Sequence, residues 1–470
     1  MSFIKNTEIK MHNVESTQFG VFHLELAKTE ITEASQEINL MLDKSGSMDE
    51  SCGDGNTKMK QITYVTNNIL RFIANNCPNG NVSVSVKAFN SEVDTLIDKT
   101  VVTNENVNDL IANIGRIYPC DGTDIEKGLK AMYSESGLER HNIFMSDGDT
   151  NIGETDPILL SKFVDENAIN TFVGFGLEHN PEMFASLSET KNSSYYFIDK
   201  IEKSGIAYGE ILHGILYKCL SNVRIQITNG TIYDWKTNEW VSDIFVGNMS
   251  GEMKKTFHIM SVVKDEIQIT VEGIFLNEPF RISYGFQGQI EDLQKMIYRQ
   301  KTQEILFRAK HANVKREKQE IQKLKEEMKQ FVSEMKDYMK ETNDLLLKNL
   351  CDDIVIVYRT IGTIHGHMYS CSRQTSQGSE RLHNVSDTPR TRYNLRPQYN
   401  LTAPRYNYLS LDEICQEEDN VFAIDTDLDE EMDEHIISDG LENTPYYSGR
   451  VATVMRSVTE EDNAIEEDAN

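Results

Sequence analysis

Apolar and polar positions alternate with a characteristic period in the first half of the chain. Within residues 37–218, short apolar runs such as "INLML" and "VSVSVKAF" are separated by amphipathic stretches of helical period. This alternation predicts βαβ units and an α/β fold with a doubly wound, mainly parallel sheet that is covered by helices on both faces. Right-handed crossovers would bring the carboxyl ends of the parallel strands to one edge of that sheet.

Strand-like runs separated by turn residues predict a second, β-rich unit. Residues 219–288 contain runs such as "NVRIQITNG" and "DEIQITVEGIF", broken by Asn-Gly and Ser-Gly turns, and residues 1–36 contain two further alternating segments. This pattern predicts a small additional β-sandwich domain. Because the strand count of 219–288 is low for closure, we expect strands of 1–36 to complete it, with the α/β unit inserted between them.

A long helical segment is predicted for residues 289–361, which contain neither glycine nor proline. Its apolar positions fall at alternating spacings of three and four, which forms a heptad seam. We expect an amphipathic helix or helical hairpin that packs on its own β-domain, or else a coiled coil that self-associates through 289–350. The seam positions are Ile321, Leu324, Met328, Phe331, Met335, Tyr338, Thr342 and Leu345.

The last part of the chain, residues 362–470, is predicted to be a low-order tail. No lysine follows Lys348, and Ser, Thr, Asn, Tyr and Gln crowd residues 369–410. Residues 411–470 hold twenty acidic side chains against two arginines, so most of the net charge of −28 belongs to this acidic end. A compositional change of this kind is typical of a disordered acidic tail.

The composition of the whole chain limits the partner classes. Hydrophobic content of 39% and charged content of 26% are typical of a folded protein. The acidic excess disfavours nucleic acid and membrane surfaces and leaves metal ions and proteins as partners. The N-terminus lacks a signal-peptide core and no run of eighteen apolar residues follows, so we expect a cytoplasmic protein. The scattered cysteines predict reduced thiols, and frequent Asn, Ile and Lys suggest an AT-rich genome, such as that of a large DNA virus or a protist.

Oxygen-bearing side chains cluster at the ends of the predicted strands. Two carboxylates and three hydroxyls would form a hard, compact oxygen set, which suits Mg²⁺ or Mn²⁺ better than Ca²⁺, zinc or copper. The alternative is that the same side chains only cap helices and satisfy turns. The candidate metal ligands are Asp43, Ser45 and Ser47 after the first strand, Thr123 in "PCDGTDIEKGL" and Asp147 after "HNIFM".

The motifs "DKSGSM", "DGTD" and "SDGD" at these three points resemble the metal-ion-dependent adhesion site of a von Willebrand factor type A (VWA) domain, and the likeness extends over about 37–218. In this resemblance all the motif positions are filled. The chain departs from the family at "CDGT", where two glycines often precede the threonine, and at Ser146, where threonine is frequent. The resemblance implies a bound magnesium ion with one open position, to be filled by an Asp or Glu side chain of a partner protein.

An enzyme is one rival interpretation. An aspartate at a strand end is also typical of magnesium-dependent phosphotransferases, but these need a second acid two residues later, where this chain has Ser45. We therefore expect no catalytic residue and no enzymatic activity. The second interpretation that stays open is a structural assembly protein that oligomerises through its helical segment.

Two weaker signals remain. His365, His367 and Cys371 lie close together in sequence, as a soft metal site would require, but lack a fourth ligand. The acidic tail places many carboxylates at high effective concentration near a site that captures carboxylates, so the tail is a candidate blocker of the metal site.

Overall fold

The computed structural model describes residues 3–380, with short gaps, together with Val454. The predicted acidic tail, and any blocking of the metal site by it, lie outside the described residues apart from Val454, which is buried. The gaps are residues 15–16, 31–34, 51–56, 78, 134–138, 148–149, 176–179, 199–203, 262–265, 287–291, 316–317, 343 and 364–365.

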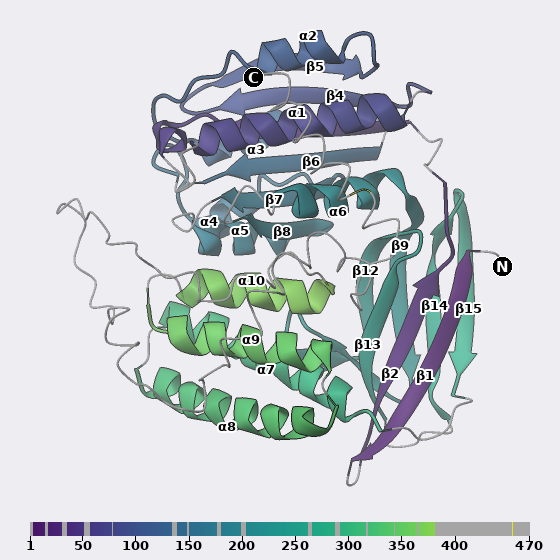
Figure 1. Ribbon diagram of the computed structural model, residues 1–470. Coiled ribbons are helices and arrows are strands. Elements are labelled where there is room, and N and C mark those ends of the chain that lie inside the picture. Colours follow the sequence, from purple (N-terminus) through teal and green to yellow (C-terminus); the bar gives the residue numbers. More distant parts are fainter. Residues whose placement is uncertain are drawn as a thin grey trace.

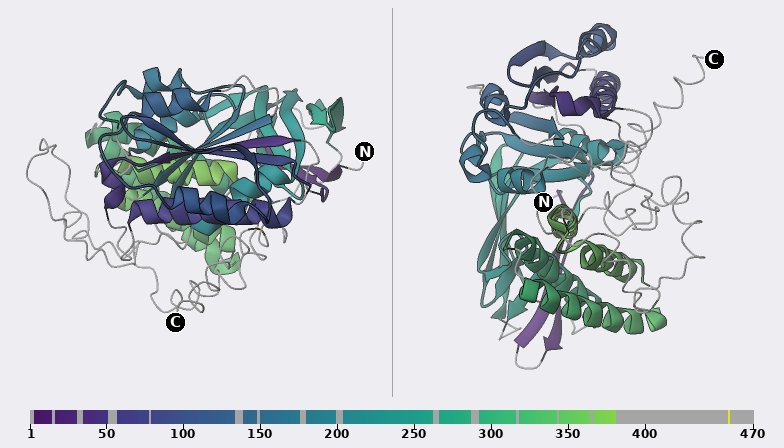
Figure 2. Two further views of the ribbon diagram at one scale, coloured as in Figure 1. Left: turned by 90° about the horizontal axis from the view of Figure 1, so that it is seen from above. Right: turned by 90° about the vertical axis from the view of Figure 1, so that its left-hand side faces the viewer.

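A six-stranded sheet with helices on both faces forms the α/β part of the molecule (Figures 1 and 2). Its strand order is β5-β4-β3-β6-β7-β8, and every neighbouring pair is parallel except β4 with β5. The predicted α/β fold with a mainly parallel sheet is confirmed. The strands are β3 (Gln36–Asp43), β4 (Val82–Phe89), β5 (Val93–Val101), β6 (Glu139–Ser146), β7 (Ile169–Phe175) and β8 (Ser193–Ile198).

Two apolar cores lie on the two faces of this sheet. Successive residues of β3 alternate between them: Leu40 and Leu42 belong to the core that includes α1 and α6, and Met41 belongs to the core that includes α3 and α5. Burial on both faces explains why the strands are almost continuously apolar. The helices are α1 (Lys58–Asn76), α2 (Val107–Ile114), α3 (Ile125–Met132), α4 (Pro157–Ser161), α5 (Pro181–Ser188) and α6 (Ser204–Leu216), preceded by the short 3-10 helix η1 (Gly46–Asp49).

Two antiparallel sheets lie beside the α/β part and share one apolar core, and together they are called the β-sandwich below (Figure 1). Their strand orders are β1-β2-β13-β10-β11 and β12-β9-β14-β15. Because β2 pairs with β13, the chain begins in the sandwich, leaves it for the six-stranded sheet and then returns. The strands are β1 (Ile4–Val14), β2 (Thr17–Leu26), β9 (Lys218–Thr228), β10 (Thr231–Asp234), β11 (Glu239–Val241), β12 (Asp243–Ser250), β13 (Lys254–Ser261), β14 (Gln268–Phe275) and β15 (Glu278–Gly285).

The predicted helical segment is a bundle of several helices packed together. The central seam positions on α8, Leu324, Met328, Phe331 and Met335, are buried in one core with apolar residues of α7 and α9. The amphipathic face is thus filled by neighbouring helices of the same chain. The helices are α7 (Gln294–Lys315), α8 (Lys318–Thr342), α9 (Leu345–Thr360) and α10 (Gly366–Ser379).

Helix α10 lies within the segment that the composition predicts to be of low order, so that boundary at 362 is wrong. Arg373 Nη1 of α10 lies 3.0 Å from Asp353 Oδ1 of α9, and Gln377 donates to the other oxygen of the same carboxylate at 2.6 Å. On its other side, α10 packs Tyr369 and Cys371 into the core shared with α5. Polar side chains are buried in matched pairs here, which composition alone cannot reveal.

Three further expectations concern cysteines, membrane spans and the soft metal cluster. The cysteines that the structure describes are free. Within the same residues, no helix is both long and apolar enough to span a membrane. His367 Nε2 lies 3.3 Å from Cys371 Sγ, one helical turn away, whereas His365 falls outside the described residues.

Candidate metal site and interaction surface

The predicted site lies at the carboxyl edge of the six-stranded sheet. Asp43 is the last residue of β3, and Asp147 follows the last residue of β6. Because β3 and β6 are parallel neighbours, with Leu42 opposite Met145, the two aspartates emerge side by side. After Asp43 the chain turns into η1, with Ser45 at the N-cap position of this helix and Ser47 within it.

Hydrogen bonds join four of the five predicted side chains into one chain of oxygens. Asp43 Oδ1 accepts from the backbone N–H of Ser45 at 2.7 Å. The hydroxyls of Ser45 and Ser47 lie 3.1 Å apart, and Ser47 donates to Asp147 Oδ1 at 2.9 Å. Ser146 donates to the remaining oxygen of Asp43. Asp43, Ser45 and Asp147 are buried, so these oxygens are fixed in place rather than spread over a mobile surface.

Thr123 lies on a second loop that docks against the first. The backbone N–H of Gly46 donates to Asp121 O at 2.9 Å, which ties the two loops together. Thr123 itself is buried, and its backbone N–H donates to Asn151 Oδ1 at 2.8 Å. Its hydroxyl makes no hydrogen bond within the described part of the chain, and so none joins it to the other four predicted side chains. The structure therefore places Thr123 on the loop beside the cluster.

The same loop explains how the chain accommodates its departure from the two-glycine pattern. Asp121 stands where the family often has a glycine, and its φ of 63° lies in the left-handed region. Aspartate tolerates this conformation better than most residues. At Gly122, a Cβ atom would lie 2.5 Å from Asn151 Oδ1, so a side chain there would push the loops apart. Of these two positions, the one that keeps its glycine, Gly122, is therefore the one where close packing requires it.

Lys58 belongs to the site although the sequence motifs do not include it. Its ammonium nitrogen lies 2.6 Å from Asp147 Oδ2 and 2.7 Å from Glu50 Oε2, and its side chain is only 7% exposed. Lys58 is the first residue of α1, directly after the N-cap Thr57. A lysine in the first turn of a helix opposes the helix dipole, and this is the one sequence signal that marks it as unusual.

Burial and mutual repulsion shape the electrostatics of the cluster. Burial, and then the nearby charge of Asp147, raise the pKa of Asp43 to about 6. Burial alone would lower the pKa of Lys58, but the carboxylates of Asp147 and Glu50 outweigh it and raise that pKa overall. Two carboxylates are thus held close together at a cost that a cation can offset.

The donor set fits a hard divalent cation. It contains two carboxylates and the hydroxyls of serine and threonine, without the sulfur or imidazole ligands that zinc and copper prefer. Among the residues that the structure describes, no group of three or more His, Cys, Asp and Glu side chains is arranged to hold a metal ion, at this edge or elsewhere. The cluster is a candidate metal site because its two carboxylates are accompanied by hydroxyl oxygens.

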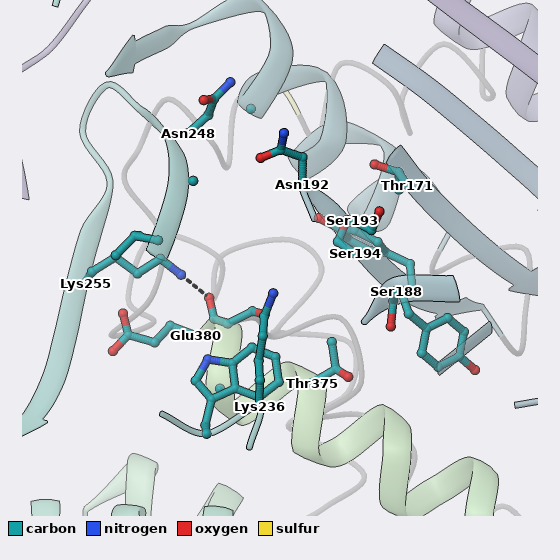
Figure 3. Close-up of a pocket in the computed structure, with 18 of the residues that line it drawn as sticks. Thr171, Ser188, Asn192, Ser193, Ser194, Lys236, Asn248, Lys255, Thr375 and Glu380 are labelled. Carbon is teal, nitrogen blue, oxygen red and sulfur yellow. Dashed lines mark hydrogen bonds between the residues drawn. The ribbon is translucent and has the colours of Figure 1, made fainter. Parts of the chain in front are cut away.

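A second candidate location is a cavity of about 390 Å³ where the three parts of the molecule meet (Figure 3). Thr171, Ser193 and Ser194 line it from the α/β part, at the edge opposite the metal site. Lys255 of β13 faces them and donates to the carbonyl oxygen of Ser379 at the end of α10. Lys255 thus links β13 to the end of α10 across this wall.

Comparison with known families finds a match over part of the α/β unit. The model of the von Willebrand factor type A domain matches residues 38–149, from β3 to the loop after β6. All five predicted ligands fall within the match. This segment of the chain is therefore a VWA domain, while the β-sandwich and the helical bundle lie beyond the match.

Several solved structures are similar to this chain at low sequence identity. A von Willebrand factor type A protein from Catenulispora acidiphila has 12% identity and a TM-score of 0.49, with 67% of this chain and 82% of that chain covered. The ArnB paralog VWA2 from Sulfolobus acidocaldarius has 11% identity and a TM-score of 0.45 (79% and 96% covered). The pilus adhesin SpaC from Lactobacillus rhamnosus GG has 11% identity and a TM-score of 0.35 (59% and 47% covered). A search of curated proteins found no significant match.

Proposed function

We propose that this protein is a metal-dependent protein-interaction module. Asp43, Ser45, Ser47, Thr123 and Asp147 would hold Mg²⁺ or Mn²⁺, and the ion would receive an Asp or Glu side chain of a partner protein. The observation that carries the proposal is the series of hydrogen bonds that runs from Asp43 through Ser45 and Ser47 to Asp147, with both carboxylates buried.

The chemistry of the donors supports a role in binding an anionic partner. A divalent ion that is contacted mainly by neutral hydroxyls keeps much of its charge, so it attracts a further carboxylate strongly. Ion and acidic partner should then bind with positive coupling, each raising the affinity for the other.

Binding, rather than catalysis, is the proposed role. A phosphotransferase that used Asp43 as its nucleophile would need an acid two residues later, and Ser45 occupies that position. The hydroxyl of Ser45 instead pairs with that of Ser47. We therefore expect no turnover of a generic phosphate ester in the presence of magnesium.

Electron paramagnetic resonance of Mn²⁺ tests this proposal. The wild-type chain should remove free Mn²⁺ from solution, and addition of a short acidic peptide should alter the spectrum of the bound ion. Asp147→Asn should abolish both effects, whereas Asp109→Ala, on the exposed surface of α2, should leave both unchanged. A wild-type chain that takes up no Mn²⁺ would rule the proposal out.

A further inference from the structure

We propose that Lys58 acts as a built-in cation at the metal site: its ammonium group occupies Asp147 when no ion is bound and so sets the concentration of divalent ion that the site requires. This inference rests on the proposed function and adds a residue that controls it. It also predicts that the Lys58 ammonium group and a divalent ion compete for Asp147.

The geometry shows that Lys58 is part of the site rather than an exposed residue at its border. Its nitrogen lies 2.6 Å from Asp147 Oδ2, while the other oxygen of that carboxylate accepts from Ser47. The side chain of Asp147 is 1% exposed. A buried carboxylate with a direct charged partner is strongly stabilised, and removal of the partner leaves a costly unpaired charge.

The position of Lys58 in α1 argues against a role in helix stability. The N-terminus of a helix carries partial positive charge, which disfavours a lysine there. Lys58 is the first residue of a helix of 19 residues, and Thr57 already caps it by accepting from the backbone N–H of Lys60. The charge of Lys58 is therefore explained by the carboxylates that it meets and not by the helix that carries it.

Glu50 gives the ammonium group a second position. Its carboxylate lies 2.7 Å from the same nitrogen, and its side chain is 55% exposed. The backbone N–H of Lys58 donates to Glu50 O at 3.0 Å, so the two residues stay together. When an external cation takes Asp147, Lys58 can keep its bond to Glu50 near solvent. An ion must therefore displace a tethered competitor, which lowers its apparent affinity.

Calorimetric titration of the full chain with Mg²⁺ and with Mn²⁺ tests this inference through Lys58→Met and a matched control, Lys60→Met. Lys60 lies two residues further along α1 and is exposed. Loss of the ammonium group should lower the dissociation constant of the divalent ion at least about tenfold. A tenfold change corresponds to about 1.4 kcal/mol of binding free energy. The control should match the wild type. Lys58→Gln, whose amide can still donate to Asp147, provides a second neutral variant should Lys58→Met fold poorly.

Thermal unfolding supplies a second readout. In EDTA, Lys58→Met should unfold at a lower temperature than the wild type because Asp147 loses its partner, and magnesium should raise its unfolding temperature by more than it raises that of the wild type. Equal or weaker ion binding by both neutral variants would overturn the inference while leaving the proposed function standing. Binding by the neutral variants alone would show that Lys58 replaces the ion altogether, and would overturn the metal-dependent function instead. No binding by any variant would overturn both.

Discussion

The Arg299 guanidinium and the Glu380 carboxylate form a buried ion pair, with 2.8 Å between Nη1 and Oε1, that joins the helical bundle to the β-sandwich. Glu380 follows α10 and also accepts from the backbone N–H of Thr256 on β13 at 3.1 Å. Arg299, on α7, donates in addition to the carbonyl oxygen of Gln377. The end of α10 is thus held by α7 of the helical bundle and by β13 of the β-sandwich.

Loss of one member of this pair should destabilise the molecule strongly. Glu380→Ala leaves the buried Arg299 without its countercharge, and we expect the free energy of unfolding to fall by about 3–5 kcal/mol. Urea denaturation measures the change. Glu278→Ala, at the exposed start of β15, serves as the control and should change stability by less than about 0.5 kcal/mol. Equal stability of the two variants would mean that the pair does not hold the parts together.

A second contact at the same junction depends on a glycine. A Cβ atom added to Gly378 of α10 would lie 2.0 Å from Trp235 Cδ2, and Gln374 donates to the carbonyl oxygen of the same tryptophan. Gly378→Ala should therefore displace α10 and lower the free energy of unfolding by about 1–3 kcal/mol. Gly214→Ala in α6 is the matched control, since a Cβ there meets nothing within 4 Å. That variant should be neutral or stabilising; if Gly378→Ala behaved likewise, the close packing of Trp235 on α10 would be refuted.

Much of the site is predictable because it depends on local order along the chain. Asp43 and Asp147 follow strands that the apolar pattern reveals, and parallel neighbours end at one edge by necessity. Ser45 and Ser47 lie within four residues of Asp43, so their proximity needs no knowledge of distant contacts. Lys58 reaches the site only after an intervening segment of the chain. The pattern of apolar residues, which predicts the strands, does not predict where that segment ends.

Helix α10 illustrates why composition misjudges other parts of the fold. Its serines and glutamines are typical of unfolded segments, yet most of its polar residues are buried. Their burial is stabilised by partners on α9 and the β-sandwich, such as Asp353 for Arg373. The composition of α10 alone cannot reveal partners that lie far away along the chain.

The loop conformation of Asp121 leads to a further prediction. Its positive φ suits glycine, so Asp121→Gly should keep ion binding and change stability little, whereas Asp121→Val should lose about 1–2 kcal/mol because a β-branched side chain is strained there. Because Asp121 O accepts from Gly46, the valine variant should also weaken ion binding. Parallel unfolding and Mn²⁺ titrations check both effects. Identical behaviour of the two variants would contradict the strained conformation.

His141 predicts a specific dependence of stability on pH. Burial lowers the pKa of His141 from its usual 6.5 to about 4, with the neighbouring Glu139 carboxylate opposing this effect. Between these values the unfolded chain binds a proton that the folded chain does not, so stability is full above pH 6.5 and falls as the pH drops toward 4. The loss from this one group is at most about 3 kcal/mol.

Substitution of the ring isolates this contribution. The ring nitrogens of His141 make no hydrogen bond within the described residues, so His141→Phe should be tolerated at pH 7 and should lose less stability than the wild type between pH 6.5 and 4. The exposed His311→Gln serves as the control and should follow the wild-type pH dependence. Parallel curves for wild type and His141→Phe would show that the buried imidazole does not titrate as expected.

The most direct test of the metal site is a calorimetric titration of the full chain with Mg²⁺, for the wild type and for Asp43→Ala. Our account predicts saturable uptake of one ion by the wild type and none by the variant, with far-ultraviolet circular dichroism confirming that both are folded. Absence of magnesium uptake by the wild type, or undiminished uptake by a folded Asp43→Ala chain, would contradict it.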